Sequence, residues 1–122
     1  MIKINQGILY DKLDDNLKVL VNVTSYKIGA YTFDVEKMLL TLNDESVKLT
    51  RIESYLLILF ANNERKMLLR KDILTSIWNV DTYSNSRSLD VYIFKLRKLL
   101  SKDSNIIIVN IHDKGYRMII DL

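Results

Sequence analysis

The sequence predicts an α+β fold in which a small antiparallel sheet precedes a bundle of three helices and a C-terminal β-hairpin. Three patterns support this order. Short runs of β-favouring residues fill Tyr26–Leu49, apolar residues recur at helical spacing in three parts of Thr50–Lys102, and two apolar runs flank a polar turn near the C-terminus. A chain of 122 residues can bury one core, so we expect one domain over residues 26–122.

Residues 1–25 precede this domain and allow two interpretations. Lys18–Val23 alternates enough to form a strand, and Asp14-Asp15-Asn16 has the composition of a turn. Spaced apolar residues could instead line one face of a helix: Ile8, Leu9, Leu13, Leu17 and Leu20. We treat the segment as a linker or N-terminal extension.

The sheet is predicted from three short runs. Tyr26–Phe33 is rich in aromatic and β-favouring residues and is interrupted at Gly29. Met38–Leu42 and Val47–Leu49 follow, separated by a turn at Asn43-Asp44. Strands this short need a helix packed against them, so the sheet and the following helices are expected to share one core.

Thr50 begins the first helix, because its hydroxyl can cap the first turn and Glu53 stands three residues later, as in a capping box. Asn62-Asn63 ends this helix. Its apolar residues recur at helical spacing: Ile52, Leu56, Leu59 and Phe60, with Tyr55 and Leu57 beside them. Arg70–Trp78 predicts a second, shorter helix whose inward residues are Ile73, Leu74 and Ile77.

The third helix is expected at about Asn85–Lys102, capped by Asn85 or Ser86. Its buried stripe comprises Leu89, Ile93, Leu96 and Leu100. At 100° per residue the opposite face carries Arg87, Val91, Phe94 and Lys98, flanked by Ser88 and Lys95. Two explanations remain open for the outward apolar pair: packing against a neighbouring segment, or contact with thymine methyl groups in a major groove.

The C-terminal runs Ile106–Ile111 and Tyr116–Ile120 predict a β-hairpin. Its polar turn carries His112 and Lys114, and Gly115 is expected to ease the backbone there. Such a tip can be an ordinary solvated loop. A basic hairpin after a basic helix can also be a wing that lies along a minor groove.

Charge distribution favours a polyanionic partner. The net charge is only +3, but residues 85–117 carry seven basic side chains against three acidic ones: Arg87, Lys95, Arg97, Lys98, Lys102, Lys114 and Arg117 against Asp90, Asp103 and Asp113. A concentration of this kind suits nucleic acid, although a solvated helix face also explains many such runs.

Catalysis and cofactor chemistry find little support. The chain has one histidine, no cysteine and three glycines, so no glycine-rich nucleotide loop can be assembled. We expect no enzyme activity, no cofactor and no metal site. No apolar stretch approaches the roughly 18 residues that span a bilayer, and the lack of cysteine fits the cytoplasm.

Most of the run Ile28–Leu122 resembles the OmpR/PhoB-type winged helix-turn-helix effector domain of bacterial two-component response regulators. The strongest matches are SRSLDVYIFKLRKLL at Ser86–Leu100 and IVNIHDKGYRMI at Ile108–Ile119. The others follow in the family's order: IGAYTFD at Ile28–Asp34, LTRIESYLLILFANN at Leu49–Asn63 and LLRKDILTSIW at Leu68–Trp78. The resemblance implies a four-stranded sheet, three helices and a hairpin wing.

The resemblance also implies site residues. The helix from Ser86 would read the major groove, and the hairpin tip with His112 and Lys114 would form the wing. Base-reading positions carry over to Ser88, Val91, Phe94 and Lys95. Backbone-binding positions carry over to Arg70, Ile77, Trp78, Asn79, Arg87, Tyr92, Arg97, Asn110 and Tyr116. For Trp78, packing is an equally good explanation.

Three positions depart from the family's pattern. Phe94 occupies a position that is often basic, so an apolar contact replaces a guanine contact there. His112 stands where some relatives have a minor-groove arginine, and Asp113 adds a negative charge near phosphate. These differences weaken the electrostatic attraction and leave the target sequence open.

The function implied is sequence-specific binding of double-stranded DNA in transcription regulation, within a two-component phosphorelay. Family members bind direct repeats as head-to-tail pairs, and the loop Asn79–Asn85 corresponds to the segment that meets RNA polymerase. The alternative is a winged helix that contacts RNA polymerase or a partner domain and has little affinity for DNA. The outward pair Val91 and Phe94 is compatible with either function.

Overall fold

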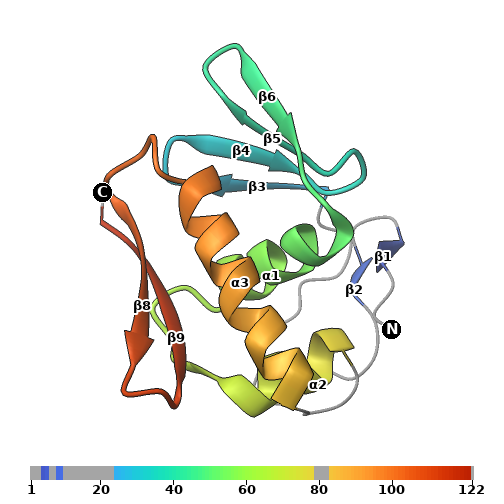
Figure 1. Ribbon diagram of the computed structural model, residues 1–122. Coiled ribbons are helices and arrows are strands. Elements are labelled where there is room, and N and C mark those ends of the chain that lie inside the picture. The colour runs from blue at the N-terminus through green and yellow to red at the C-terminus, as the bar shows by residue number, and fades with distance from the viewer. Residues whose placement is uncertain (1–3, 6–7, 10–23, 79–82, 122) are drawn as a thin grey trace.

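The computed structural model describes residues 4–5, 8–9, 24–78 and 83–121 (Figure 1). Near the N-terminus, β1 (Ile4–Asn5) and β2 (Ile8–Leu9) pair antiparallel. The helical interpretation is therefore wrong for Ile8 and Leu9. Leu13, Leu17, Leu20 and the proposed strand Lys18–Val23 lie outside the described residues.

The predicted N-terminal sheet is an antiparallel meander of four strands in the order β3-β4-β5-β6. Gly29 interrupts the first run as expected, and its φ of 56° suits the turn between Ile28 and Tyr31. Asn43 also has a positive φ, 55°, in the turn after Leu42. The strands are β3 (Ser25–Ile28), β4 (Tyr31–Asp34), β5 (Leu39–Leu42) and β6 (Glu45–Lys48).

The first helix, α1 (Arg51–Asn62), begins as the sequence predicts. The Glu53 backbone N–H donates to the Thr50 hydroxyl at 3.2 Å, and the Thr50 N–H donates to the Glu53 carboxylate at 2.8 Å. This capping box satisfies two N–H groups that the helix itself leaves without a partner. Asn63 caps the other end through its backbone N–H.

The second and third helices are α2 (Arg70–Trp78) and α3 (Tyr83–Leu99). The bounds of α2 agree with the prediction, whereas α3 begins before Asn85 and Ser86. The expectation that either residue caps α3 is therefore wrong, since both lie inside the helix. The Ser86 hydroxyl instead accepts a hydrogen bond from the side chain of Arg70, a partner that the local sequence does not reveal.

The C-terminal hairpin is part of a three-stranded sheet in the order β7-β9-β8. The strands are β7 (Leu68–Leu69), β8 (Ile106–Ile111) and β9 (Gly115–Ile120), and the sequence did not predict β7. Leu68 pairs with Tyr116 and Leu69 pairs with Gly115. The hairpin is thereby joined to the chain just before α2.

Gly115 has a different role from the one expected. A Cβ atom on Gly115 would lie 2.0 Å from the carbonyl oxygen of Leu68, so this close approach of β7 and β9 requires glycine. The turn itself uses positive φ angles at His112 (46°) and Asp113 (60°). It is closed by the N–H of Lys114, which donates to the Ile111 carbonyl at 2.8 Å.

The four-stranded sheet, the three-stranded sheet and all the described helices contribute to one core. In Figure 1, α3 crosses the front of α1, the four-stranded sheet lies above them, and the β8–β9 hairpin lies along one side. Phe33, Phe60 and Ile93 are each at most 1% exposed. Within the described ranges, no helix combines the length and apolar character needed to cross a membrane. This core leaves one side of α3 at the surface, between the hairpin and α2.

Candidate nucleic-acid interface

The two sides of α3 differ sharply in burial. Leu89, Ile93 and Leu96 are fully buried, as the periodicity predicts. On the opposite side, Val91 is 53% exposed and Phe94 is 58% exposed. The alternative that these two side chains pack against a neighbouring segment is therefore wrong. An exposed apolar pair on a helix this polar is unusual and suggests contact with another molecule.

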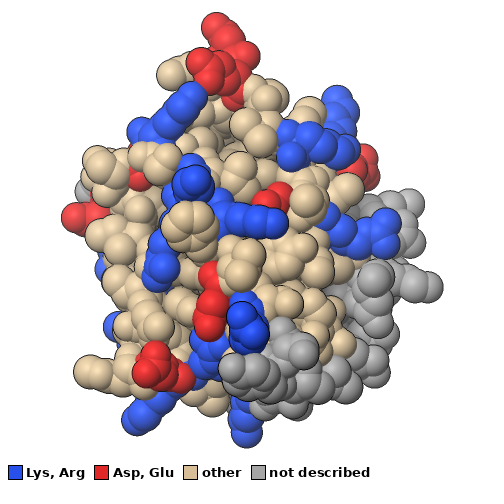
Figure 2. Space-filling model, in the orientation of Figure 1, with Lys and Arg blue, Asp and Glu red and all other residues tan. Residues whose placement is uncertain are grey.

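Basic side chains surround the exposed pair. Arg87, Lys95 and Lys98 are all exposed, and the Lys98 ammonium lies 5.2 Å from the centre of the Phe94 ring. The Lys95 ammonium lies 5.0 Å from the centre of the Tyr92 ring. Figure 2 shows Lys and Arg side chains gathered across the face that α3 crosses. We refer to Arg87, Val91, Phe94, Lys95 and Lys98 as the outward face of α3.

The predicted residues of α2 border this face. Trp78 is half-buried, and its ring centre lies 6.0 Å from that of Tyr92. Trp78 thus packs, although part of its surface remains accessible. Ile77 is only 3% exposed, so it could offer a ligand little besides its main chain. Ser88 is half-buried one turn before Tyr92, and Asn79 lies outside the described residues.

The hairpin tip presents His112 and Lys114 to solvent. Asn110 is occupied in shaping the turn, because its side-chain oxygen accepts the Asp113 N–H at 3.0 Å. The carbonyl of Lys114 accepts the backbone N–H of Arg70 at 3.0 Å. The tip is therefore tied to the first residue of α2, next to the N-terminal half of α3.

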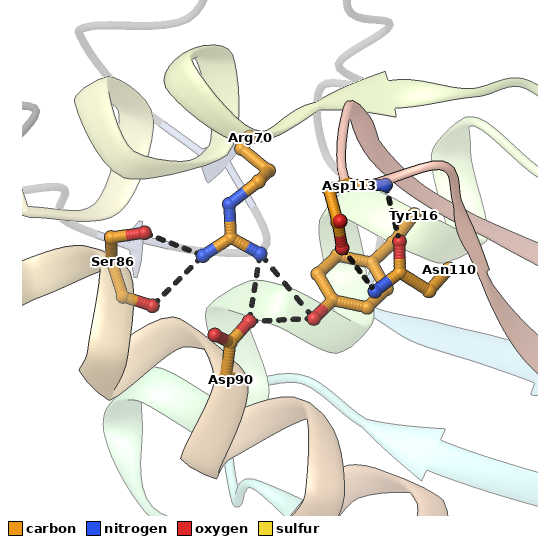
Figure 3. A network of polar contacts seen from close by, with 6 residues as sticks. All are labelled: Arg70, Ser86, Asp90, Asn110, Asp113 and Tyr116. Atoms are coloured by element: carbon orange, nitrogen blue, oxygen red, sulfur yellow. Dashed lines mark hydrogen bonds and ion pairs between the residues drawn. The ribbon is translucent and has the colours of Figure 1, made fainter.

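A polar network joins α2, α3 and β9 (Figure 3). One carboxylate oxygen of Asp90, Oδ1, accepts hydrogen bonds from Arg70 Nη1 at 2.7 Å and from the Tyr116 hydroxyl at 2.6 Å. Arg70 Nη2 donates to the main-chain oxygen of Ser86 at 3.0 Å and also to its hydroxyl. We call Arg70, Ser86, Asp90 and Tyr116, together with Arg97, which binds β8, the wing seam.

The charges in this network stabilise one another. Partial burial raises the pKa of Asp90, but the hydrogen bonds from Arg70 and Tyr116 outweigh it and hold that pKa below its ordinary value. The hydrogen bond to Asp90 in turn raises the pKa of Arg70. Burial, with the hydrogen bond to Asp90, raises the pKa of Tyr116. At neutral pH the seam thus contains an ionised carboxylate, a guanidinium and a neutral phenol.

Arg97 extends the seam along α3. Its Nε and Nη2 both donate to the Ile108 carbonyl of β8, at 3.0 and 2.8 Å. The guanidinium carbons of Arg70 and Arg97 lie 5.8 and 5.9 Å from the centre of the Tyr116 ring. Tyr116 is only 4% exposed. Arg70, Arg97 and Tyr116, which the resemblance assigned to backbone binding, are therefore engaged within the protein.

Sequence reasoning did not assign a role to Asp90. One signal was available, because Asp90 is the single acidic residue in the α3 sequence. Its partners Arg70 and Tyr116 lie 20 and 26 residues away in the chain, so local spacing does not identify them.

The family described as "Transcriptional regulatory protein, C terminal" matches residues 44–118. Transcriptional regulatory protein RprY of Bacteroides fragilis is 50% identical over 94 residues, which cover 77% of this chain and 40% of that protein. Heme response regulator HssR of Staphylococcus epidermidis is 32% identical over 93 residues, covering 75% and 42%. This chain thus spans about two fifths of the length of these relatives.

Solved structures share the fold. The DNA-binding domain of CpxR from E. coli superposes with a TM-score of 0.70 at 17% identity, over 80% of this chain and 98% of that one. The Klebsiella pneumoniae RstA DNA-binding domain, solved in complex with the RstA box, gives a TM-score of 0.65 at 25% identity, over 80% and 98%. The predicted fold class is confirmed. The chain belongs to the OmpR/PhoB-type winged helix-turn-helix family of effector domains, which are the C-terminal domains of transcriptional regulatory proteins.

Proposed function

We propose that this chain binds double-stranded DNA with sequence preference, placing α3 in a major groove and the β8–β9 tip along the adjacent minor groove. The observation that carries the proposal is the outward face of α3, where exposed Val91 and Phe94 stand among exposed cations. A major groove admits an α-helix and presents both thymine methyl groups and phosphates to such a surface. The RstA domain, which shares this fold, was solved in complex with the RstA box, and this supports binding of DNA by the present chain.

The roles divide by chemistry. Val91 and Phe94 would contact thymine methyl groups, while Lys95 and Ser88 would meet base edges, at about 1–3 kcal/mol per good contact. Phosphate contacts would fall to Arg87, Tyr92, the accessible edge of Trp78 and the main chain near Ile77. Because Phe94 is apolar and Asp113 is acidic, discrimination would depend on methyl groups and groove shape more than on arginine–guanine pairs.

The relatives support a regulatory setting for this binding. HssR is named a response regulator, so we propose that this chain acts as the effector domain of a two-component regulator. Head-to-tail pairs would then bind direct repeats about one helical turn apart, with each copy on the same face of the duplex. The segment Asn79–Asn85 would contact RNA polymerase; residues 79–82 lie outside the described residues, and Tyr83–Asn85 form the start of α3 instead of the predicted loop.

Salt dependence and a charge-matched control variant test the proposal. Binding to a selected duplex should weaken linearly in log–log form as salt rises, because bound cations release phosphate counterions. Arg87→Ala with Lys95→Ala should weaken binding and reduce the slope by about 1, because Arg87 is the one of the two that is assigned to phosphate. Lys27→Ala with Lys37→Ala removes the same charge from the N-terminal sheet and its β4–β5 turn, and should leave binding nearly unchanged.

Two results would contradict the proposal. Unchanged duplex binding by the Arg87 and Lys95 double variant would show that α3 is not part of the interface. No duplex affinity even at low salt would favour the alternative, in which the outward face contacts RNA polymerase or a partner domain.

A further inference from the structure

We infer that Asp90 is a positioning residue that fixes the hairpin wing on α3, so that helix and wing can engage neighbouring grooves together. The inference rests on the proposed function and concerns a residue outside the outward face. Asp90 lies on α3, touches α2 and β9, and need not touch DNA to act.

Three elements of the fold meet at one carboxylate oxygen of Asp90. Asp90 Oδ1 accepts from Arg70 Nη1 at 2.7 Å and from the Tyr116 hydroxyl at 2.6 Å, so α2, α3 and β9 meet there (Figure 3). Arg70 and the Tyr116 hydroxyl are also within 3.4 Å of each other. Hydrogen bonds to an ionised acceptor are shorter and stronger than those between neutral groups. Such bonds suit a contact that must hold the wing at a fixed angle to α3.

Packing around Tyr116 makes the arrangement specific. The ring is buried, with the guanidinium groups of Arg70 and Arg97 5.8 and 5.9 Å from its centre. Only the hydroxyl end reaches Asp90. A shift of β9 along α3 would break the hydroxyl contact and displace the ring from both cations, so the seam defines one register of the wing.

Electrostatics argue against a role for Asp90 in direct contact with DNA. Its side chain is 54% exposed, and it lies one turn from Arg87 and Phe94 on the same helix. A carboxylate at that place repels phosphate, so removing its charge should strengthen non-specific binding. If Asp90 instead positions the wing, removing its charge should weaken binding to the specific site. The two roles therefore differ in the sign of the effect.

The experiment compares Asp90→Asn with a matched control, Asp113→Asn, in the whole chain. Asp113 is an exposed acidic residue at the wing tip, and asparagine tolerates its positive φ of 60°. Affinity is measured for a duplex site obtained by selection and for a scrambled duplex at the same salt. Asp90→Asn should weaken the specific site about tenfold and leave scrambled binding unchanged or tighter. Asp113→Asn should tighten both.

Tyr116→Phe provides a second, milder test, because it removes only the hydroxyl from the seam. Hydroxyl-radical footprints should lose protection of the minor-groove sugars next to the site, while protection of guanine N7 from dimethyl sulfate in the major groove under α3 remains. This variant also decides the question if circular dichroism shows that Asp90→Asn does not fold.

The outcomes separate the two proposals. Wild-type protein that binds no duplex overturns the proposed function, and this inference with it. Wild-type binding together with an Asp90→Asn variant that behaves like Asp113→Asn, or an unchanged footprint for Tyr116→Phe, overturns the inference alone.

Discussion

The outward face of α3 and the α3 residues of the wing seam lie on the same helix but differ in what their side chains do. The outward face leaves Val91 and Phe94 more than half exposed, with cations beside them. In the seam, Asp90 and Arg97 hold β9 and β8 through short hydrogen bonds. The outward side chains are therefore available to another molecule, whereas Asp90 and Arg97, although also exposed, are hydrogen-bonded within the fold.

The difference changes how the predicted DNA-binding residues are understood. Arg87 and Lys95 are exposed and can reach a duplex directly. Arg70, Arg97 and Tyr116 are already bonded within the protein, so their contribution to binding would come mainly from the angle between helix and wing. Recognition would then depend on direct contact at Arg87 and Lys95, and on geometry at Arg70, Arg97 and Tyr116.

The largest expected effect separates the buried and exposed sides of α3. Ile93→Ala removes a fully buried side chain and should lower the free energy of unfolding by about 2–5 kcal/mol. Val91→Ala should change it by less than about 0.5 kcal/mol. Urea denaturation of both variants measures the difference. A comparable loss for Val91→Ala would mean that the outward face is packed and not available.

Arg97 and Lys98 are neighbours that differ in the same way. Arg97→Ala leaves the Ile108 carbonyl without two donors and should lower the free energy of unfolding by about 1–2 kcal/mol. Lys98→Ala should leave stability within about 0.5 kcal/mol of wild type and weaken duplex binding. Equal stability losses for the two variants would contradict the claim that Arg97 stabilises the fold and Lys98 does not.

A smaller effect should appear in the thymine methyl groups. Replacing a contacted thymine with deoxyuridine removes one methyl group, which should cost about 0.8 kcal/mol of binding free energy. Phe94→Ala should abolish the sensitivity at the position it contacts. Titrations of wild-type and variant protein with both duplexes measure this. Equal affinity of wild-type protein for thymine and deoxyuridine sites would contradict the methyl contact.

The smallest effect concerns pH. Because the pKa of Asp90 is held below its ordinary value, the seam stabilises the fold fully at pH above that ordinary value and loses this contribution as pH falls through the lowered pKa. Arg70 and Tyr116 keep their charge states in this range, since their pKa values are raised. The stability difference between wild type and Asp90→Asn should therefore shrink in acid. A pH-independent difference would show that Asp90 does not act through its charge.

Much of the fold follows from local sequence signals. Thr50 and Glu53 identify the start of α1, because both halves of a capping box lie within four residues. The bounds of α2, the buried stripe of α3 and the two hairpin strands also follow from periodicity. The outward position of Val91 and Phe94 needs only the helical angle.

The features that were not predicted depend on distant partners. β7 has two residues and no periodicity, and Leu68 is defined as a strand only by pairing with Tyr116. Position 115 requires glycine because the backbone of β7 lies so close to it. Ser86 was expected to cap α3, but its hydroxyl accepts a hydrogen bond from Arg70 instead. The role of Asp90 likewise depends on side chains from α2 and β9, which only the folded chain brings together.

Selection of bound sequences from random duplexes tests the central claim most directly, with wild-type protein and the two double variants in parallel. Wild type and the Lys27→Ala, Lys37→Ala control should enrich the same thymine-containing site, repeated about one helical turn apart. The Arg87→Ala, Lys95→Ala variant should enrich that site weakly or not at all. Enrichment of no sequence by wild type, or of the same site with equal strength by all three proteins, would contradict the account.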